Sequence, residues 1–138
     1  MIYIGRDEYI FNEEEYADEM YFLKQGEVQI VLKEFNNFQF IKIEPGYYFG
    51  EVDLLFGETH KYTHLAHSDV ELLVLSKKDF NIIFFHEFRE IGSELYKNAL
   101  KRKVRYDKRY KEALEYCKKK KENFFINLDQ QNIYRKRK

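Results

Sequence analysis

The sequence predicts a mainly β fold, an antiparallel β-barrel or jelly roll, followed by C-terminal α-helices. Up to residue 76, short apolar runs alternate with turn-forming segments, which is typical of antiparallel strands. After Ser76 the apolar residues recur every three or four positions, as they do in helices. The chain has 138 residues, of which 44% are hydrophobic and 18% aromatic, so it is large enough for one domain with its own core.

The strands are expected where an apolar run ends at a turn. Val28, Ile30 and Leu32 alternate with other side chains, as the pleat of a strand requires. Residues 44–46, Glu-Pro-Gly, form a turn because proline fixes the first central torsion and glycine accepts a positive one. The expected strands are residues 9–11, 20–23, 28–32, 38–43, 62–66 and 70–76, with further turns at 24–26, 34–37 and 67–69.

The helices are expected from Ser76 onward. Ser76 is the predicted N-cap, with Asp79 three residues later in a variant of the capping-box pattern. The expected helices cover residues 77–86 and 90–121, with an apolar face of Ile91, Leu95, Ala99, Tyr106, Tyr110, Ala113, Leu114 and Cys117. Residues 123–138 carry no consistent period, so we expect a frayed tail there unless something binds it.

The neutral net charge hides an acidic part and a basic part. Basic and acidic residues number 24 each, but residues 1–100 hold 9 basic and 19 acidic side chains, whereas residues 101–138 hold 15 and 5. The overall balance argues against general attraction to nucleic acid and against a disordered chain. We expect a barrel with trailing helices over residues 1–103, and a basic helical extension with the frayed tail over residues 104–138.

Several classes of protein are excluded at this stage. The single cysteine, Cys117, forms neither an internal disulfide nor a cysteine zinc site. No window approaches eighteen apolar residues, so neither a membrane span nor a secretory signal is expected. We therefore expect a cytoplasmic protein.

Neither a metal site nor catalysis is expected. His60 and His64 share a face of one extended segment, but His67 does not, and no carboxylate cluster accompanies them. Asp53 and Glu58 are two carboxylates on one loop, without a nucleophile or a partnered general base. A solvated acidic loop accounts for them, and we predict that the chain is not an enzyme.

One loop carries candidate binding chemistry. Gly50 would let a ligand approach the main chain closely, and a helix starting near Glu51 presents unpaired amides that hold an anion. The carboxylate of Glu51 is also placed to accept protons from sugar hydroxyl groups. The alternative is that Glu51 only contributes charge at a helix N-terminus.

A family pattern is spread over the same residues. Residues 9–11 are Tyr-Ile-Phe, and residues 18–26 are Asp-Glu-Met-Tyr-Phe-Leu-Lys-Gln-Gly. Residues 49–51 are Phe-Gly-Glu, followed by the apolar pair Leu54 and Leu55. Together these segments resemble the barrel and the phosphate-binding cassette of the cyclic nucleotide-binding domain family, over roughly residues 7–103. The ligand-binding residues that this resemblance implies are Phe49, Gly50, Glu51, Val52, Leu54, His60, Lys61 and Thr63.

The resemblance implies cAMP or cGMP as the ligand, but one position departs from the family. Nine residues after the cassette glutamate the family has an arginine that pairs with the cyclic phosphate, and this chain has His60. Histidine lacks the permanent charge and the planar pair of donors of arginine, so we expect weak or absent binding. Lys61 lies one residue along a strand and is expected to face the other way.

Two further differences concern the fold. The family's second barrel glycine falls at Glu14, which predicts a different turn there. The family's initial helix and first strand are largely missing ahead of residue 9, so we expect an N-terminally incomplete fold. The family also closes a helix over the base, and four aromatic residues either cap a purine or pack the helix on the barrel: Phe84, Phe85, Phe88 and Tyr96.

The resemblance implies a regulatory, ligand-sensing module. The long basic helix after the barrel looks most like the cytosolic tail of a voltage-gated potassium or cation channel. The alternatives are a structural or protein-interaction module with a degenerate pocket and the regulatory domain of a cyclic nucleotide-dependent kinase. The C-terminal helices are a candidate surface for homo-oligomers. Residues 101–121 form a solvated or packed helix, a target for calmodulin or anionic lipid, or, least favoured, a nucleic-acid contact.

Overall fold

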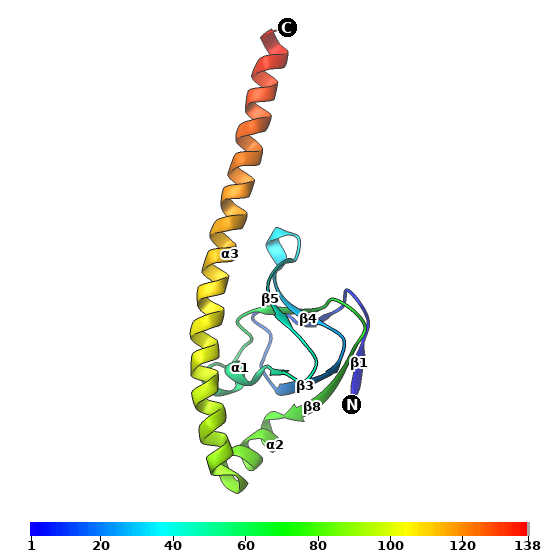
Figure 1. The fold of residues 1–138 in the computed structure, drawn as a ribbon, viewed down its shortest axis with the longest axis vertical. Coiled ribbons are helices and arrows are strands. Elements are labelled where there is room, and N and C mark those ends of the chain that lie inside the picture. The colour runs from blue at the N-terminus through cyan, green and yellow to red at the C-terminus, as the bar shows by residue number, and fades with distance from the viewer. Residues whose placement is uncertain (138) are drawn as a thin grey trace.

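In the computed structural model two antiparallel sheets pack face to face, and one long helix runs along them and continues past them (Figure 1). The structure describes residues 1–137, with side chains up to residue 130. The elements are β1 (Ile2–Ile4), β2 (Tyr9–Phe11), β3 (Glu19–Gln25), β4 (Val28–Leu32), η1 (Lys33–Phe35), β5 (Phe38–Ile43), β6 (Tyr48–Phe49), α1 (Glu51–Phe56), β7 (Thr63–Ala66), β8 (Val70–Ser76), α2 (Lys77–Asn81), the π-helix η2 (Ile82–Glu87) and α3 (Arg89–Arg137). The strand orders are β1-β8-β3-β6 and β2-β7-β4-β5.

The mainly β fold with C-terminal helices is confirmed. All six predicted strands are present, within one or two residues of the predicted bounds. Among the described residues the two sheets are hydrogen-bonded separately, so the arrangement is a jelly-roll-like sandwich and not a closed barrel. Two short strands were not predicted. β1 is held by pairing with β8, and β6 by pairing with β3.

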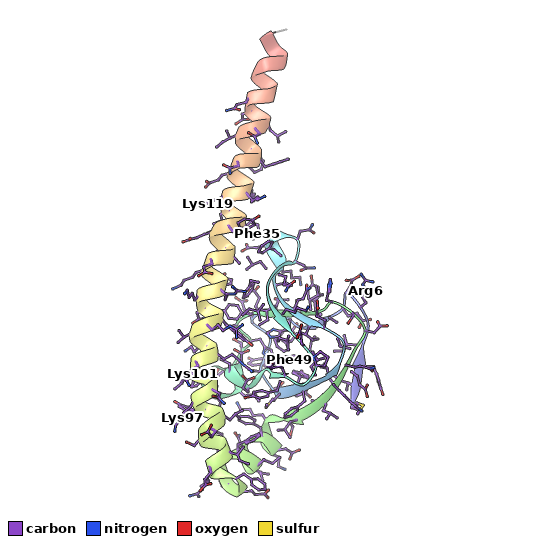
Figure 2. All side chains as sticks on the ribbon, viewed as in Figure 1. Arg6, Phe35, Phe49, Lys97, Lys101 and Lys119 are labelled. Atoms are coloured by element: carbon purple, nitrogen blue, oxygen red, sulfur yellow. The ribbon has the colours of Figure 1, made fainter. Side chains whose placement is uncertain are left out.

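The core lies between the two sheets and extends to α3. Val28 of one sheet and Leu72 of the other have no exposed surface, and Phe49 lies between the sheets (Figure 2). Ala113 and Cys117 of α3 belong to the same buried cluster. Burying these apolar side chains is what fixes α3 on the sandwich as far as Cys117.

Glu14 lies in a turn whose backbone conformation favours glycine, so the predicted change of turn at this position is not required. Its φ is 72°, in the left-handed region that favours glycine. A glycine here would adopt the same φ without strain, so the change to glutamate does not require a different turn. The amide of Glu14 donates to the carbonyl oxygen of His60 at 2.8 Å, which ties this turn to the segment before β7.

The helical part begins as predicted and ends later. The hydroxyl of Ser76 accepts a hydrogen bond from the amide of Asp79 at 3.2 Å, which confirms the N-cap. Leu95 and Ala99 are buried as expected, but Ile91 is 55% exposed. α3 stays helical through Arg137, although a frayed tail was predicted from residue 123. The sequence has no glycine or proline after Gly92 to stop the helix. Within residues 1–137, no helix combines the length and the apolar character that crossing a membrane requires.

Replacing Gly92 by alanine is expected to destabilise the fold by about 1–3 kcal/mol. Gly92 is buried at the start of α3, and a Cβ there would lie 1.9 Å from the carbonyl oxygen of Phe84 in η2. In an exposed helix the same change stabilises by up to about 1 kcal/mol, so the predicted sign is the opposite of helix propensity. Urea unfolding measures the difference, with the exposed Ser93→Ala as the control. A Gly92→Ala protein more stable than wild type would contradict the packing at this junction.

Candidate ligand-binding site

A cleft of about 420 Å³ lies between α1, the segment before β7, and α3. The local backbone that forms it depends on Gly50, which precedes α1 with a φ of 91°. A Cβ at Gly50 would also come within 3.0 Å of the carbonyl oxygen of Glu19. Glycine is therefore required here both for the torsion and for the close approach of β3. α1 begins at Glu51, as predicted, at the edge of the cleft.

The structure brings most of the predicted ligand-binding residues together, but not all of them. The residues that line the cleft are Gly50, Glu51, Val52, His60 and Lys61. The residues that are buried in the protein interior outside the cleft lining are Phe49, Leu54 and Thr63. Phe49 stacks on Tyr21 with ring centroids 5.2 Å apart. Neighbouring residues of a strand or helix point in different directions, which separates these three from the cleft.

An arginine of α3 binds the cassette glutamate. Arg102 Nη1 donates to Glu51 Oε1 at 2.6 Å and to the carbonyl oxygen of Tyr48 at 2.8 Å. Its guanidinium carbon also lies 4.6 Å from the centre of the Tyr48 ring. Sequence reasoning did not identify Arg102. The carboxylate that was predicted to accept hydroxyl protons from a ligand therefore already accepts a hydrogen bond from the protein's own helix.

Glu51 is the most confined charge of the site. Only 1% of its surface is exposed, and its Oε2 is buried without a hydrogen-bond partner among the described residues. Burial raises the pKa of this carboxyl, and the opposing charge of Arg102 holds the increase back. Burial would lower the pKa of Arg102, but the charge of Glu51 raises it overall, so each group favours the charged form of the other. Oε2 retains an unused capacity to accept a hydrogen bond.

His60, which the sequence predicts at the position of the family arginine, is buried and contacts two neighbouring side chains. It is 3% exposed, and its Nδ1 lies 2.9 Å from Asp53 Oδ2. Its ring stacks on Phe11 with centroids 3.5 Å apart. The neighbouring His64 is fully buried, and burial lowers its pKa to about 3, so it is neutral. Neither imidazole offers the cleft a free, permanently charged donor.

Lys61 lines the cleft but its charge is paired. Its Nζ donates to Asp107 Oδ1 of α3 at 2.9 Å, and the hydroxyl of Tyr62 donates to the same oxygen. Burial alone would raise the pKa of Asp107, but these two hydrogen bonds and the charge of Lys61 lower it overall. Asp107 is therefore a second point, after Arg102, at which α3 is fixed to the cleft.

The lining as a whole is acidic. The lining contains more carboxylates than lysines. The carboxylates are Glu13, Glu14, Glu51, Asp53, Glu58 and Asp107, and the lysines are Lys61 and Lys103. Such a lining opposes the approach of an anion. The four aromatic residues considered as purine caps lie outside it, and Tyr96 packs on Phe56 with centroids 5.2 Å apart. Within residues 1–130 there is no group of three side chains suited to hold a metal ion.

The sequence and the fold have counterparts among known proteins. The sequence profile described as "Cyclic nucleotide-binding domain" matches residues 1–87, which is more than half of the chain. The chain belongs to the cyclic nucleotide-binding domain family. The domain of this family is a regulatory fold.

The curated relatives of this cyclic nucleotide-binding domain are much longer proteins. It is 30% identical over 89 residues to cyclic nucleotide-gated channel beta-1 of Homo sapiens, a match that covers 62% of this chain and 7% of the channel. The same identity and length are found with cyclic nucleotide-gated channel beta-1 of Bos taurus, where 6% of the channel is covered. The chain thus spans a small part of these relatives.

Solved structures share the fold of the domain. The EAL enzyme Bd1971, in a form bound to cAMP and cyclic-di-GMP, matches with a TM-score of 0.62 and 24% identity over 77% of this chain and 28% of the other. The regulatory subunit of a cAMP-independent protein kinase A from Trypanosoma brucei matches with a TM-score of 0.61 and 17% identity, over 72% and 34%. The c-di-GMP-responsive regulator CLP of Xanthomonas campestris matches with 0.61 and 18%, over 78% and 52%.

Proposed function

We propose that this domain is the cytosolic, non-catalytic regulatory part of an ion channel, and that its cleft binds cAMP and cGMP weakly or not at all. The observation that carries the second part is His60. It replaces the arginine that the family uses for the cyclic phosphate, and its Nδ1 is engaged by Asp53 at 2.9 Å. A phosphate in this cleft would meet Asp53 and the other carboxylates without an unpaired arginine to offset them.

The cleft could couple a ligand to α3 through Arg102. A ligand that uses Glu51 as its hydroxyl acceptor competes with the guanidinium that now occupies Oε1. Binding would then favour a position of α3 in which Arg102 has left Glu51. A ligand shifts such an equilibrium only by the difference between its affinities for the two positions. The movement of α3 is the signal that the channel would receive.

The assignment to a channel is supported by the relatives. Cyclic nucleotide-gated channel beta-1 is 30% identical over 89 residues, and α3 continues the domain as a long basic helix. A kinase regulatory subunit is supported only by the likeness of fold to the Trypanosoma brucei protein, at 17% identity. We therefore favour the channel and a cytoplasmic location for this domain.

A second function is favoured by a specific contact. If the cleft is filled by the protein's own side chains, the domain is an interaction module with a degenerate pocket, and the bond from Arg102 to Glu51 supports this alternative. The remaining volume of about 420 Å³ supports ligand binding, because small-molecule sites have volumes of about 300–1,000 Å³. Titration with nucleotides distinguishes the two functions.

Replacing His60 by arginine is expected to strengthen binding of cAMP or cGMP by about 1.5–3 kcal/mol, or tenfold or more in Kd. The new guanidinium would supply the missing charge and paired donors at the phosphate position. Isothermal titration calorimetry at neutral pH measures both proteins, and wild type should bind more weakly than micromolar. Micromolar or tighter binding by wild type would contradict the proposal.

Two further variants control this comparison. His67→Arg adds the same charge on a half-exposed side chain outside the cleft lining, and it should leave affinity unchanged. Asp53 would compete with phosphate for the new arginine, so His60→Arg with Asp53→Asn should bind more tightly than His60→Arg alone. If neither His60→Arg nor its combination with Asp53→Asn gains affinity, the cassette is shaped wrongly for a phosphate and the interaction module becomes the better interpretation.

A further inference from the structure

The distal helix, defined as residues 118–130 of α3, has no covering in this chain. Every residue from Lys118 to Gln130 is exposed. Its first turn consists of four lysines, and it continues with Phe124 and Leu128, which are 61% and 38% exposed. Figure 1 shows α3 running beyond the sandwich, and Figure 2 places Lys119 on that part of the helix. Basic and large apolar side chains on one segment are typical of a docking surface.

The apolar side chains of the distal helix continue the face that packs on the sandwich. Tyr110, Cys117 and Phe124 are spaced by seven residues. Leu114 and Leu128 are fourteen residues apart, which is twice that spacing. Residues seven apart lie on nearly the same side of a helix. Cys117 is buried against the sandwich, whereas Phe124 is exposed. The docking face of α3 therefore extends past the sandwich that it docks on.

A second uncovered surface lies on the sandwich itself. The acidic patch, as we call it, consists of Glu13, Glu14, Glu15, Asp18 and Glu58. Backbone hydrogen bonds join the two segments that carry it, from Ala17 to Glu58 at 2.9 Å and from Glu14 to His60 at 2.8 Å. Tyr16, between these acids, is 75% exposed. None of the patch carboxylates forms an ion pair with another described residue.

The distal helix of a chain does not reach its own acidic patch. Glu13, Glu14 and Glu58 line the cleft together with Asp107 of α3. Lys118 lies eleven residues further along the same unbroken helix, which is about 16 Å at the rise of an α-helix. Within one chain the two surfaces are thus complementary in charge but separated in space.

We propose that the distal helix of one chain docks on the acidic patch of a second copy. The charges favour this occupant, since the distal helix begins with four consecutive lysines and the acidic patch consists of five carboxylates. Pairing two distal helices in parallel and in register along their apolar face would instead place Lys121 of one against Lys121 of the other. In the proposed contact Lys120 and Lys121 flank Phe124 on one side of the helix, with Lys118 at the edge of that side, and they face carboxylates. Phe124 meets the exposed ring of Tyr16.

Sedimentation velocity of the 138-residue chain at low and at high salt tests the proposal. Wild type should associate as its concentration rises, and salt should weaken the association because the contact is electrostatic. A chain that stays monomeric at low salt at every concentration would overturn the proposal. So would an association that is unaffected by salt, since that would indicate an apolar contact elsewhere.

Two charge-reversal variants then assign the surfaces. The helix variant carries Lys118→Glu, Lys120→Glu and Lys121→Glu, and the patch variant carries Glu14→Lys, Asp18→Lys and Glu58→Lys. Each variant alone should raise the dissociation constant tenfold or more, and an equimolar mixture of the two should restore association. Loss of association in the helix variant but not in the patch variant would overturn the proposal, as would a mixture that fails to associate.

The matched control reverses the charge of three exposed lysines that lie outside both surfaces, through Lys77→Glu, Lys78→Glu and Lys97→Glu. It should associate like wild type. Circular dichroism checks that all variants are folded. Vesicles containing phosphatidylserine and calcium-loaded calmodulin serve as alternative partners for wild type. Binding to either one, by a chain that does not self-associate, would overturn the proposal in favour of that partner.

Discussion

Replacing Arg102 by methionine should lower the free energy of unfolding by about 3–5 kcal/mol at about pH 8. Methionine keeps much of the apolar stem but removes the guanidinium that donates to Glu51 at 2.6 Å and to the carbonyl oxygen of Tyr48 at 2.8 Å. Glu51 is 1% exposed, so its charge would remain buried without a cation beside it. A buried charge that loses its partner is among the most destabilising single changes known in proteins.

The loss should depend on pH in a definite direction. Burial raises the pKa of Glu51 above its ordinary value of 4.5, and Arg102 opposes the increase, so in the variant the pKa rises further. A carboxyl whose pKa is raised by folding contributes stability that is fully present below the unfolded pKa and lost as pH rises through the folded pKa. Arg102→Met should therefore regain part of its lost stability at about pH 5 relative to about pH 8.

Urea unfolding at both pH values measures this, with Arg109→Met as the control. Arg109 is an exposed arginine on the same helix, and its loss should matter little at either pH. Glu51→Gln together with Arg102→Met removes both charges and should be more stable than Arg102→Met alone at about pH 8. An equal loss at the two pH values would show that Glu51 is not left as a buried charge.

The strands could be predicted because each one has a recognisable pattern in its own residues. Residues 28–32 alternate in the sequence, and residues 44–46 contain their own turn chemistry. β1 and β6 have three and two residues, too few for a period, and exist only because β8 and β3 offer edges to pair with. The helix past residue 121 was missed for a related reason. None of its described side chains is buried, and Phe124 and Leu128 alone continue the apolar spacing there, which is too few positions to predict a helix.

Half of the site could be predicted as well. Gly50 and Glu51 are neighbours in a motif, and the substitution at His60 is visible by counting. Arg102 and Asp107 were missed because they act on residues about fifty positions earlier, which no local pattern records. One signal was available for Arg102. It follows Leu95 and Ala99 on one helical face, and a charged residue within a buried stripe requires a partner.

Replacing Phe80 by alanine should cost about 3–5 kcal/mol of stability. Phe80 is 1% exposed and lies in a cluster with Leu54 of α1 and Leu95 of α3. Removing its ring leaves a cavity between the cassette helix and the start of α3, which the surrounding helices can only partly fill. Phe85→Ala is the matched control. That ring lies 5.9 Å from Phe80 but is 42% exposed, so its loss should cost far less. Equal losses would contradict the assignment of Phe80 to the core.

Combining Phe80→Ala with Arg102→Met tests whether the cluster and the ion pair hold α3 in one position. Leu54 follows Glu51 on α1, and Leu95 precedes Arg102 on α3, so the cluster fixes the distance that the guanidinium must span. If the cavity lets α3 move, Phe80→Ala already weakens the bond to Glu51, and the double variant should lose less than the sum of the two single losses. Strict additivity would mean that Arg102 holds Glu51 independently, and a ligand could then displace the arginine without moving the start of α3.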